Sequence, residues 1–472
     1  MKELKNASLA LVGTIAAMPL QIAGAILIAR VLGPTEFGIY SFAVTFSYLF
    51  ACFADGGLSI LATREIARHR DDFERQLGSL LVLKAGLSFI FMLLTLVSLS
   101  FYEYRGEDLT VLLVVALGNF ASSACIFAVG MTRAFNLMKI EGLMNFIQPF
   151  SFVALFLLGS FVYAGGDFLL LAAICFSLSY LATLLAGIFC LREIFFRQLR
   201  YDEGTLKYLA REALGIAIGW VVLLIYSRIG VIILEAGAGV AEVGYFNAAL
   251  RLVLNLGVLP YILAGAWLPV LTRTVDHDPT AFSMQARALC KYLCIGAVLL
   301  AVPLSMAADD IILLIYGREY LPAAPVFAVL MWAMFFFIVL FAPKTFLESS
   351  GRQKRWAFAA VSGLIVNMTM SYLLVPRFGA VGAAWGLFAA NAVMAFLAFL
   401  CSPPQVQWGE MQKCMIVIAA GGGLAWGTAK LIRPYSGLLS LLVSSIVFLI
   451  YLFMTSQLRW DELLKIPRRQ SV

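Results

Sequence analysis

Long apolar stretches separated by short polar loops run along the whole chain. Each is close to the roughly 20 apolar residues that a helix needs to cross the hydrocarbon core of a bilayer. We therefore predict an all-α polytopic membrane protein with about 14 transmembrane helices. The predicted spans are 8–31, 38–62, 77–101, 109–131, 142–164, 168–191, 212–234, 244–271, 287–308, 323–345, 357–376, 381–401, 414–432 and 437–456. The spans 244–271 and 414–432 fit least well, because they are short or interrupted by Pro and Gly.

The composition supports an embedded chain. Of the 472 residues, 62% are hydrophobic and 13% are charged, and the mean hydropathy is +0.93. A soluble domain carries about 25% charged residues. The chain therefore has little polar surface to spare for a soluble domain, and its main surroundings should be a phospholipid bilayer.

The positive charges fall mainly on one side of the predicted spans. With the N-terminus placed inside, the inside segments hold 25 of the 34 Lys and Arg, the outside segments hold 6, and 3 lie within spans. This bias predicts a multi-pass protein of the inner (plasma) membrane with both termini cytoplasmic. The net charge of +7 therefore reflects membrane topology, and no nucleic-acid partner is expected.

Metal and cofactor chemistry finds little support in the chain. The 8 cysteines lie in or beside apolar spans without a CxxC spacing, and only His69 and His277 are available as imidazole ligands. No metal site, disulfide framework or cofactor is expected. The chain also lacks a Walker motif, so ATP should not be its direct energy source.

The longest hydrophilic stretch divides the chain into two halves. It runs from Arg192 to Arg211 and is expected to form an interfacial helix on the inside. The shorter inside stretch 63–76 is expected to be a solvated surface helix. We predict an N-terminal six-helix lobe, a cytoplasmic linker, a C-terminal six-helix lobe, and two extra transmembrane helices with a cytoplasmic tail, at residues 1–191, 192–211, 212–401 and 402–472.

A short motif that occurs twice in the sequence supports two related lobes. The segments 36–43 and 242–249 both read Glu, apolar, Gly, two bulky residues, any two, Ala. Six spans separate them, so they share one orientation in the membrane. The pattern predicts a pseudo-two-fold axis along the membrane normal, and repeat-built transporters bind their substrate between the two halves.

Charged residues within the spans are candidate functional residues, because charge is costly in the bilayer. Lys84, Arg228 and Arg251 lie inside spans, and Arg30 lies at an outer boundary. Asn247, Arg251 and Asn255 are spaced i, i+4, i+8, which predicts one polar stripe on a helix. The stripe should face a cavity or the bundle interior. Alternatively, Arg251 bonds backbone carbonyls or extends outward, and Lys84 extends its ammonium to the inner surface.

Asp55 is the clearest carboxylate within a span. It shares a helix face with Tyr48 and Ser59. Asp55 is our candidate for coupling to a proton or cation. It could instead form an ion pair with Arg64 or Lys84, or cap a broken helix before the Gly56-Gly57 pair.

Four motifs resemble those of a known transporter family. They are Ala29–Tyr40 with Ala54–Ser59, Tyr226–Val231 with Glu242–Arg251, Ile315–Tyr320, and Pro376–Ala384. Together they resemble the polysaccharide transporter family, the Wzx-like oligosaccharide-lipid flippases of the MATE/MOP transporter superfamily. The resemblance implies two six-helix lobes in a V with two C-terminal helices here. It also implies a flippase that moves an undecaprenyl-pyrophosphate-linked oligosaccharide from the inner to the outer leaflet, for cell-surface polysaccharide export. Gly230 departs from the family, whose members often carry Asp there, so no role for that Asp carries over.

The basic residues suit such a cargo, because Arg binds phosphate oxygens in a bidentate manner. We therefore expect alternating access with substrate contacts at Arg30, Lys84, Arg228, Asn247, Arg251 and Asn255. The expected partners are the lipid-pyrophosphate-linked oligosaccharide, the bilayer, and other membrane proteins of the polysaccharide pathway at the last two spans.

Two other functions remain open at this stage. A cation-coupled multidrug exporter of the same fold would favour acidic cavity residues, whereas the basic residues dominate here. A membrane glycosyltransferase or polymerase would need a large outside region with catalytic carboxylates. The largest outside segment, 102–108, holds only a few residues. We therefore expect a transporter and not an enzyme.

Overall fold

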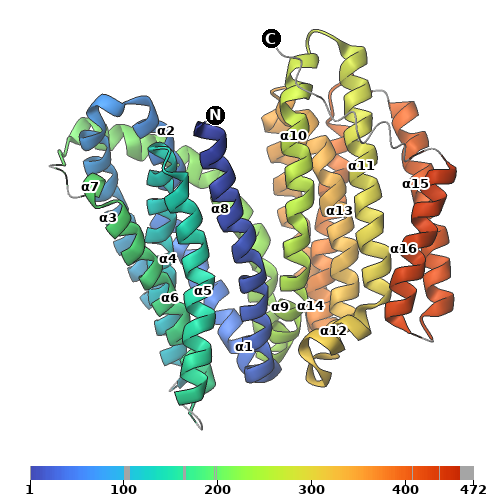
Figure 1. The fold of residues 1–472 in the computed structure, drawn as a ribbon, viewed down its shortest axis with the longest axis horizontal. Helices are drawn as coiled ribbons and strands as arrows, with labels where there is room; N and C mark the ends of the chain where they lie inside the picture. Colours follow the sequence, from blue (N-terminus) through green and yellow to red (C-terminus); the bar gives the residue numbers. More distant parts are fainter. Residues whose placement is uncertain are drawn as a thin grey trace. The chain divides into compact units, whose positions relative to one another are not determined.

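The computed structural model (Figure 1) describes residues 2–99, 107–162, 166–195, 197, 199–406, 408–434, 436–455 and 457. Across these ranges all regular structure is helical, which confirms the all-α class. Most of the outside segment 102–108 and the tail beyond residue 457 lie outside the described residues.

The first compact unit is Met1–Asn247, called here the first unit. Helix α8 packs on α1, α2 and α3 within it. Its elements are α1 (Lys2–Asp55), α2 (Leu58–Arg68), the 3-10 turn η1 (Arg70–Asp72), α3 (Phe73–Leu99), α4 (Glu107–Ala134), α5 (Met138–Val162), α6 (Phe168–Cys190), α7 (Arg192–Phe195), α8 (Glu203–Ala238) and the start of α9 (Val240–Leu254).

The second compact unit is Ala248–Val472, called here the second unit. This division into two units does not test the lobe and linker boundaries predicted from the sequence, which therefore stay predictions. The second unit contains the end of α9, η2 (Asn255–Gly257), α10 (Val258–Thr274), α11 (Pro279–Met306), α12 (Ala308–Tyr316), η3 (Arg318–Tyr320), α13 (Ala323–Ser349), α14 (Gln353–Leu400), α15 (Trp408–Ile432) and α16 (Gly437–Met454).

Within the described residues, 11 helices are long and apolar enough to cross a membrane. With 54 and 48 residues, α1 and α14 are too long for one straight span. At about 1.5 Å per residue, straight helices of that length would reach roughly 80 and 70 Å, against a core of about 30 Å. Each covers two predicted spans. The multi-pass class is therefore confirmed, while the number fourteen stays a prediction.

Glycines interrupt both long helices. Gly33 has φ 70° and ψ 174°, and Gly379 has φ 53° and ψ −132°. Gly adopts a positive φ more readily than any other residue. After the first break, the ring of Pro34 restricts φ to a value compatible with the start of a helix. The weakly predicted span 244–271 is also interrupted, because η2 separates α9 from α10.

Side-chain caps set the starts of several helices. Asp167, Asp202, Asp278 and Ser436 precede α6, α8, α11 and α16, and each accepts a hydrogen bond from a backbone N–H of the first turn. These N–H groups have no partner within the helix, so the caps satisfy donors that would otherwise be unpaired.

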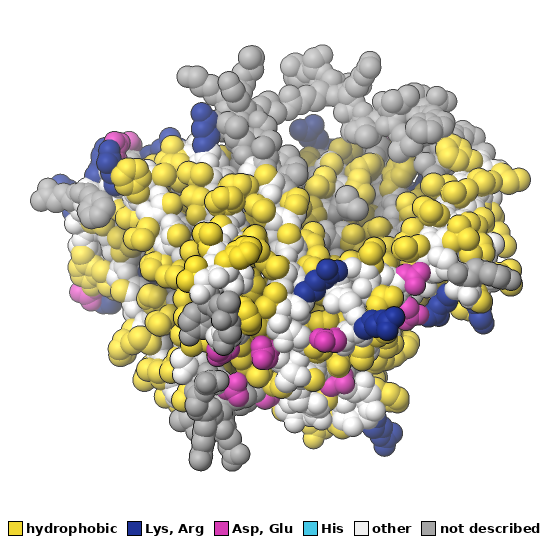
Figure 2. Space-filling view, turned by 60° about the horizontal axis from the view of Figure 1, so that its bottom comes forward, with side chains coloured by type: hydrophobic (Ala, Val, Ile, Leu, Met, Phe, Trp, Pro, Cys, Tyr) yellow, Lys and Arg dark blue, Asp and Glu magenta, His cyan; other side chains and the backbone are white. Residues whose placement is uncertain are grey.

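Apolar side chains cover much of the outer surface. Figure 2 shows hydrophobic side chains over most of the visible face, with charged side chains in smaller groups. Phe161 and Val162 at the end of α5 are 82% and 86% exposed. Exposed apolar area on this scale matches a surface that faces lipid.

Helix α2 corrects one expectation about the inside face. The stretch 63–76 was expected to be a solvated surface helix, yet it comprises the end of α2, η1 and the start of α3, and α2 buries Glu65 and Ile66 of this stretch beside the preceding Leu61 and Ala62. These apolar residues join a core with α3, α4 and the start of α8. One face of α2 packs on the core and the other face is exposed. In the sequence, the charges of the exposed face made the whole stretch look solvated.

Candidate functional site

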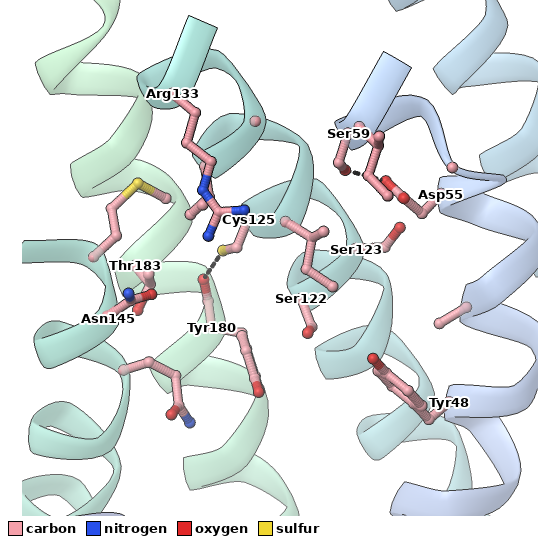
Figure 3. A pocket seen from close by; sticks show the side chains of 18 of the residues that line it. Tyr48, Asp55, Ser59, Ser122, Ser123, Cys125, Arg133, Asn145, Tyr180 and Thr183 are labelled. Atoms are coloured by element: carbon pink, nitrogen blue, oxygen red, sulfur yellow. Dashed lines mark hydrogen bonds between the residues drawn. The ribbon is translucent and has the colours of Figure 1, made fainter. Parts of the chain in front are cut away.

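A cavity of about 1080 Å³ lies within the first unit (Figure 3). Residues of α1, α2, α4, α5, α6 and α8 line it. Its charged lining residues are Asp55, Arg64, Arg133 and Arg228. Among the described lining residues, three guanidinium groups thus stand against one carboxylate, while Glu65, Glu212 and Glu141 pair with two of the guanidinium groups from outside this lining.

Neutral polar groups make up much of the remaining lining. Figure 3 shows Tyr48, Asp55 and Ser59 on one wall and Arg133, Asn145, Tyr180 and Thr183 on the opposite side. Hydroxyl and amide groups can donate and accept hydrogen bonds, as sugar hydroxyls do. The neutral polar lining residues among those described are Gln21, Tyr48, Ser59, Thr63, Ser122, Ser123, Asn145, Gln148, Tyr180, Thr183 and Ser227.

Arg133 reaches the cavity from the last turn of α4. Its Nη2 and Nε donate to the same carboxylate oxygen of Glu141, at 2.7 and 3.1 Å. Glu141 comes from α5 and its side chain is 10% exposed, whereas that of Arg133 is 56% exposed. The carboxylate therefore holds the guanidinium while leaving much of it accessible to an anion.

Arg64 is held in a similar way by α2 and α8. Its Nη2 donates to Glu212 at 2.6 Å, and its Nε donates to Glu65 at 2.8 Å. Glu65 is fully buried, whereas Arg64 and Glu212 are both partly exposed. A buried carboxylate needs a cation nearby, and Arg64, Arg68 and His69 all lie within 4 Å of it.

Arg228 contacts an aromatic ring of α1. Its guanidinium carbon lies 5.3 Å from the centre of the Tyr48 ring, within the range of a cation–π contact. Tyr48 and Arg228 both line the cavity, so the contact joins α1 and α8 across its wall. Of the predicted substrate contacts, Arg228 is the one that the structure places in this cavity.

Asp55 also lines the cavity, at the end of α1. It accepts a hydrogen bond from Ser59 at 2.5 Å, and Lys84 Nζ lies 3.6 Å from the same oxygen, Oδ1. The helix breaks directly after it, at Gly56 and Gly57 with φ of 51° and 76°. The structure thus contains both the pair with Lys84 and the break considered above, and ion coupling by Asp55 stays a prediction.

Lys84 itself lies behind the cavity wall. It is 8% exposed, and it donates to the carbonyl oxygen of Ala54 and to two oxygens of Ser123. It does not extend to the inner surface as the alternative interpretation supposed. Substrate contact by Lys84 stays a prediction, although the residue is not among those that line this cavity.

The other predicted contacts are not among the residues that line this cavity. Arg30 is exposed on α1, and the buried Asn247 donates to Val243 within α9. Asn255 donates to the backbone oxygen of Arg251. Because α9 ends at residue 254 and Asn255 opens η2, the expected stripe is interrupted before its third member. Substrate contact by these four residues stays a prediction.

The sequence interpretation missed Arg64 and Arg133. Both were counted as charges of inside loops that orient the chain, and Arg64 was considered beyond that only as a possible partner of Asp55. In the structure α4 continues to Ala134 and the inside stretch contains α2, so both side chains lie on helices that line the cavity. Hydropathy locates the apolar core of a helix and gives no signal for the polar turns that extend it.

The sequence motifs find support in a family comparison. Residues 4–275 match the family described as "Polysaccharide biosynthesis protein", and this range is more than half of the chain. The chain belongs to the polysaccharide biosynthesis protein family. This confirms the resemblance read from the four motifs.

Known proteins are similar to this member of the polysaccharide biosynthesis protein family in sequence or in fold. A Shigella flexneri protein named "Putative O-antigen transporter" is 22% identical over 76% of this chain and 87% of its own length. The inward closed structure of the lipid II flippase MurJ matches 97% of this chain and 100% of its own, with a TM-score of 0.77 and 15% identity. An inward-facing multidrug resistance MATE transporter of the MOP superfamily matches 86% and 98%, with a TM-score of 0.67 and 16% identity. The fold is therefore that of MurJ and MATE transporters.

Proposed function

We propose that this protein is a flippase for a lipid-pyrophosphate-linked oligosaccharide. It would move an undecaprenyl-pyrophosphate-linked unit from the inner to the outer leaflet of the plasma membrane by alternating access, with both termini in the cytoplasm. Membership of the polysaccharide biosynthesis family and the O-antigen transporter name of its Shigella relative support this cargo. The likeness to MurJ supports the fold that such a transporter needs.

The observation that carries the proposal is the charge of the cavity. Arg64, Arg133 and Arg228 line one space, and among its described lining residues Asp55 is the one carboxylate. A pyrophosphate is the anionic part of the proposed cargo, and guanidinium groups bind phosphate oxygens through paired N–H donors. The three arginines would anchor the pyrophosphate while hydroxyl and amide groups of the lining meet the sugars.

The size of the cavity fits the same cargo. Pockets for drug-sized ligands span about 300–1,000 Å³, and this cavity has about 1080 Å³. It has room for a pyrophosphate with several sugar rings. The lipid tail can stay in the bilayer, because the outward apolar surface of the helices already matches lipid.

Weak anchoring is as important as binding, because a transporter must release its cargo. Arg64 and Arg133 each keep a carboxylate partner, Glu212 and Glu141. An arriving phosphate would exchange with a carboxylate and would not meet a bare cation. The net gain in free energy is then the difference between two charge-assisted hydrogen bonds, which favours reversible binding.

A multidrug exporter of the same fold is the second candidate, because MATE transporters share the architecture. A cationic drug would meet more guanidinium groups than carboxylates among the described lining residues, although two of the arginines keep a carboxylate partner. The cavity charge therefore favours the anionic cargo.

Translocation in proteoliposomes tests the proposal. We compare the wild type with the Arg133→Ala/Arg228→Ala double variant, using a fluorescent lipid-pyrophosphate oligosaccharide at matched protein density. We expect the double variant to lose at least about tenfold in initial rate, because each lost charged hydrogen bond is worth about 1.5–3 kcal/mol. Arg273→Ala, at an exposed arginine in the last turn of α10, is the matched control and should transport normally.

The three outcomes lead to different conclusions. Transport by the wild type and the control, with loss in the double variant, supports both the flippase and its site. Equal transport by all three proteins keeps the flippase and overturns the arginine site. If the wild type moves a cationic dye and no lipid-linked sugar, the exporter replaces the flippase.

A further inference from the structure

The ammonium group of Lys84 lies where three helices of the first unit meet. Lys84 comes from α3, and its Nζ donates to the carbonyl oxygen of Ala54 at the end of α1, at 2.8 Å. It also donates to the hydroxyl and carbonyl oxygens of Ser123 in α4, at 2.7 and 3.0 Å. An ammonium group has three N–H donors, and each has an oxygen within reach.

Charge and geometry complete the surroundings of this ammonium. A carboxylate oxygen of Asp55 lies 3.6 Å from Nζ, and the side chain of Lys84 is only 10% exposed. The ring of Phe127 lies on another side, with its centre 5.9 Å from Nζ. A buried charge needs both a counter-charge and hydrogen-bond partners, and this site supplies both.

The break in α1 explains why carbonyl oxygens are available here. Helix α1 ends at Asp55, and Gly56 and Gly57 take positive φ values before α2 begins. The last carbonyl groups of a helix lack partners within it, and the end of the helix carries partial negative charge. Inside a membrane such groups need another partner. The ammonium of Lys84 is that partner for Ala54.

This set of oxygens is the kind that binds a cation from solution. Carbonyl oxygens at the end of a broken helix, with polar side chains, coordinate Na⁺ in repeat-built transporters. Hard cations take carboxylate, carbonyl and hydroxyl oxygens. We propose that Lys84 fills a monovalent-cation site of the first unit with the chain's own ammonium group, and that this site binds K⁺ or NH₄⁺ once the side chain is removed.

The place of the site gives the proposal its consequence. Asp55 and Ser123 also line the cavity, so an ion in the emptied site would exchange with solution through that cavity. In the wild type the positive charge is covalently attached and cannot leave. The broken helix is therefore held together without an ion from solution, and this inference stands whether or not the cargo is the one proposed above.

Thermal stability in different salts tests the inference. We compare purified wild type with Lys84→Ala in KCl, NH₄Cl, NaCl and choline chloride at equal ionic strength. The wild type should have the same Tm in all four salts. Lys84→Ala should lose about 5 °C or more in choline chloride, since a buried pair loses one partner. Part of this loss should return saturably in KCl and NH₄Cl, because K⁺ and NH₄⁺ are close in size to the lost ammonium group.

Two further variants make the result specific. Lys84→Ala/Ser123→Ala removes one oxygen ligand and should lose the rescue by K⁺. Lys344→Ala removes a lysine of the second unit whose side chain is 26% exposed. It should show no difference among the salts.

The opposite results overturn the proposal. One is a Tm of Lys84→Ala that is equally low in all four salts. Another is saturable K⁺ stabilisation of the wild type that disappears in Lys84→Ala. Lys84→Gln provides a second folded variant, because its amide can donate a hydrogen bond and its amide oxygen adds a ligand for K⁺. Since cytoplasm is rich in K⁺, failure of both variants to fold in cells also counts against a cation site.

Discussion

Gly38 and Gly244 lie directly against each other at equivalent positions of the internal repeat. A Cβ atom on Gly38 would overlap the carbonyl oxygen of Val240, and one on Gly244 would overlap the carbonyl oxygen of Pro34. Each added Cβ would also lie 3.1 and 3.3 Å from the backbone nitrogen of the opposite glycine. The contact is reciprocal, as a two-fold relation between the repeats requires. The repeated motif in the sequence therefore lies where two backbone segments are in direct contact.

We expect Gly38→Ala and Gly244→Ala each to destabilise the protein. The added methyl group would meet backbone atoms, which cannot move aside as a flexible side chain can. Overpacking costs about 1–3 kcal/mol, so the Tm of detergent-purified protein should fall by several degrees. Gly265→Ala in α10 is the control, because nothing lies within 4 Å of its Cβ position. There the better helix propensity of Ala should keep or raise the Tm. An unchanged Tm in Gly38→Ala would contradict the tight contact.

Glu141→Gln should strengthen anion binding at Arg133, if the proposed function holds. The amide keeps the shape of the carboxylate and removes its charge, so a phosphate no longer competes with Glu141 for the guanidinium. Because Arg133 is more than half exposed, we expect only about 1 kcal/mol, or roughly a fivefold lower KM. Release should slow as well, so the maximal rate should fall. Glu348→Gln, which removes the partner of Lys344 in the second unit, is the matched control. A higher KM in Glu141→Gln would show that Glu141 positions Arg133 and does not compete with the cargo.

The pair of Arg75 and Asp202 should make the stability of the first unit depend on acid pH. The hydrogen bond from Arg75, with those of Thr205, lowers the pKa of Asp202 from 3.8 to about 2. A carboxyl whose pKa is lowered on folding stabilises the folded state fully above 3.8, and the contribution is lost as the pH falls through about 2. The Tm of the wild type should therefore fall between these values more steeply than that of Asp202→Asn. Parallel curves for the two proteins would contradict a role for this pair.

Asp309 and Asp310 offer neighbouring residues with different roles. Asp310 accepts a hydrogen bond from the backbone N–H of Leu438 at 3.0 Å, in the first turn of α16, and Asp309 forms an exposed ion pair with Arg433 at 2.6 Å. Loss of a cap costs about 1 kcal/mol, whereas an exposed ion pair contributes about 0.2–1 kcal/mol. We expect Asp310→Ala to lower the Tm more than Asp309→Ala. In 1 M salt the effect of Asp309→Ala should nearly vanish, and that of Asp310→Ala should persist. Equal salt sensitivity would contradict this assignment.

The sequence predicted the class of fold because hydropathy reports directly on which helices lie in lipid. It also predicted that Arg228 and Asp55 are functional candidates, because charge inside an apolar span is rare and costly. It did not predict that Arg64 and Arg133 line the cavity with them. That arrangement depends on α2 folding back onto a core and on the polar last turn of α4, and both follow from tertiary packing.

The same limit applies to Lys84. Its sequence position is equally compatible with contact to cargo, with extension to the membrane surface, and with burial. The break at Gly56 and Gly57 accounts for the burial, because it exposes the carbonyl oxygen that Lys84 reaches from another helix, whereas contact to cargo stays a prediction. The sequence around Lys84 gives no information about a hydrogen-bond acceptor that lies 30 residues away in the chain.

If the cargo is the one proposed, the neutral polar groups of the cavity lining determine which sugars it accepts. The hydroxyl groups of Thr63, Thr183 and Ser227 donate to backbone carbonyl oxygens, so they offer their own oxygens as acceptors to a ligand. Water can bridge between a sugar hydroxyl and a polar group of the wall where the two do not meet directly. Acceptors of this kind can pair with hydroxyl groups at different positions of a sugar ring. The cavity would then admit glycans that differ in stereochemistry or branching, with discrimination left to the enzymes that assemble them.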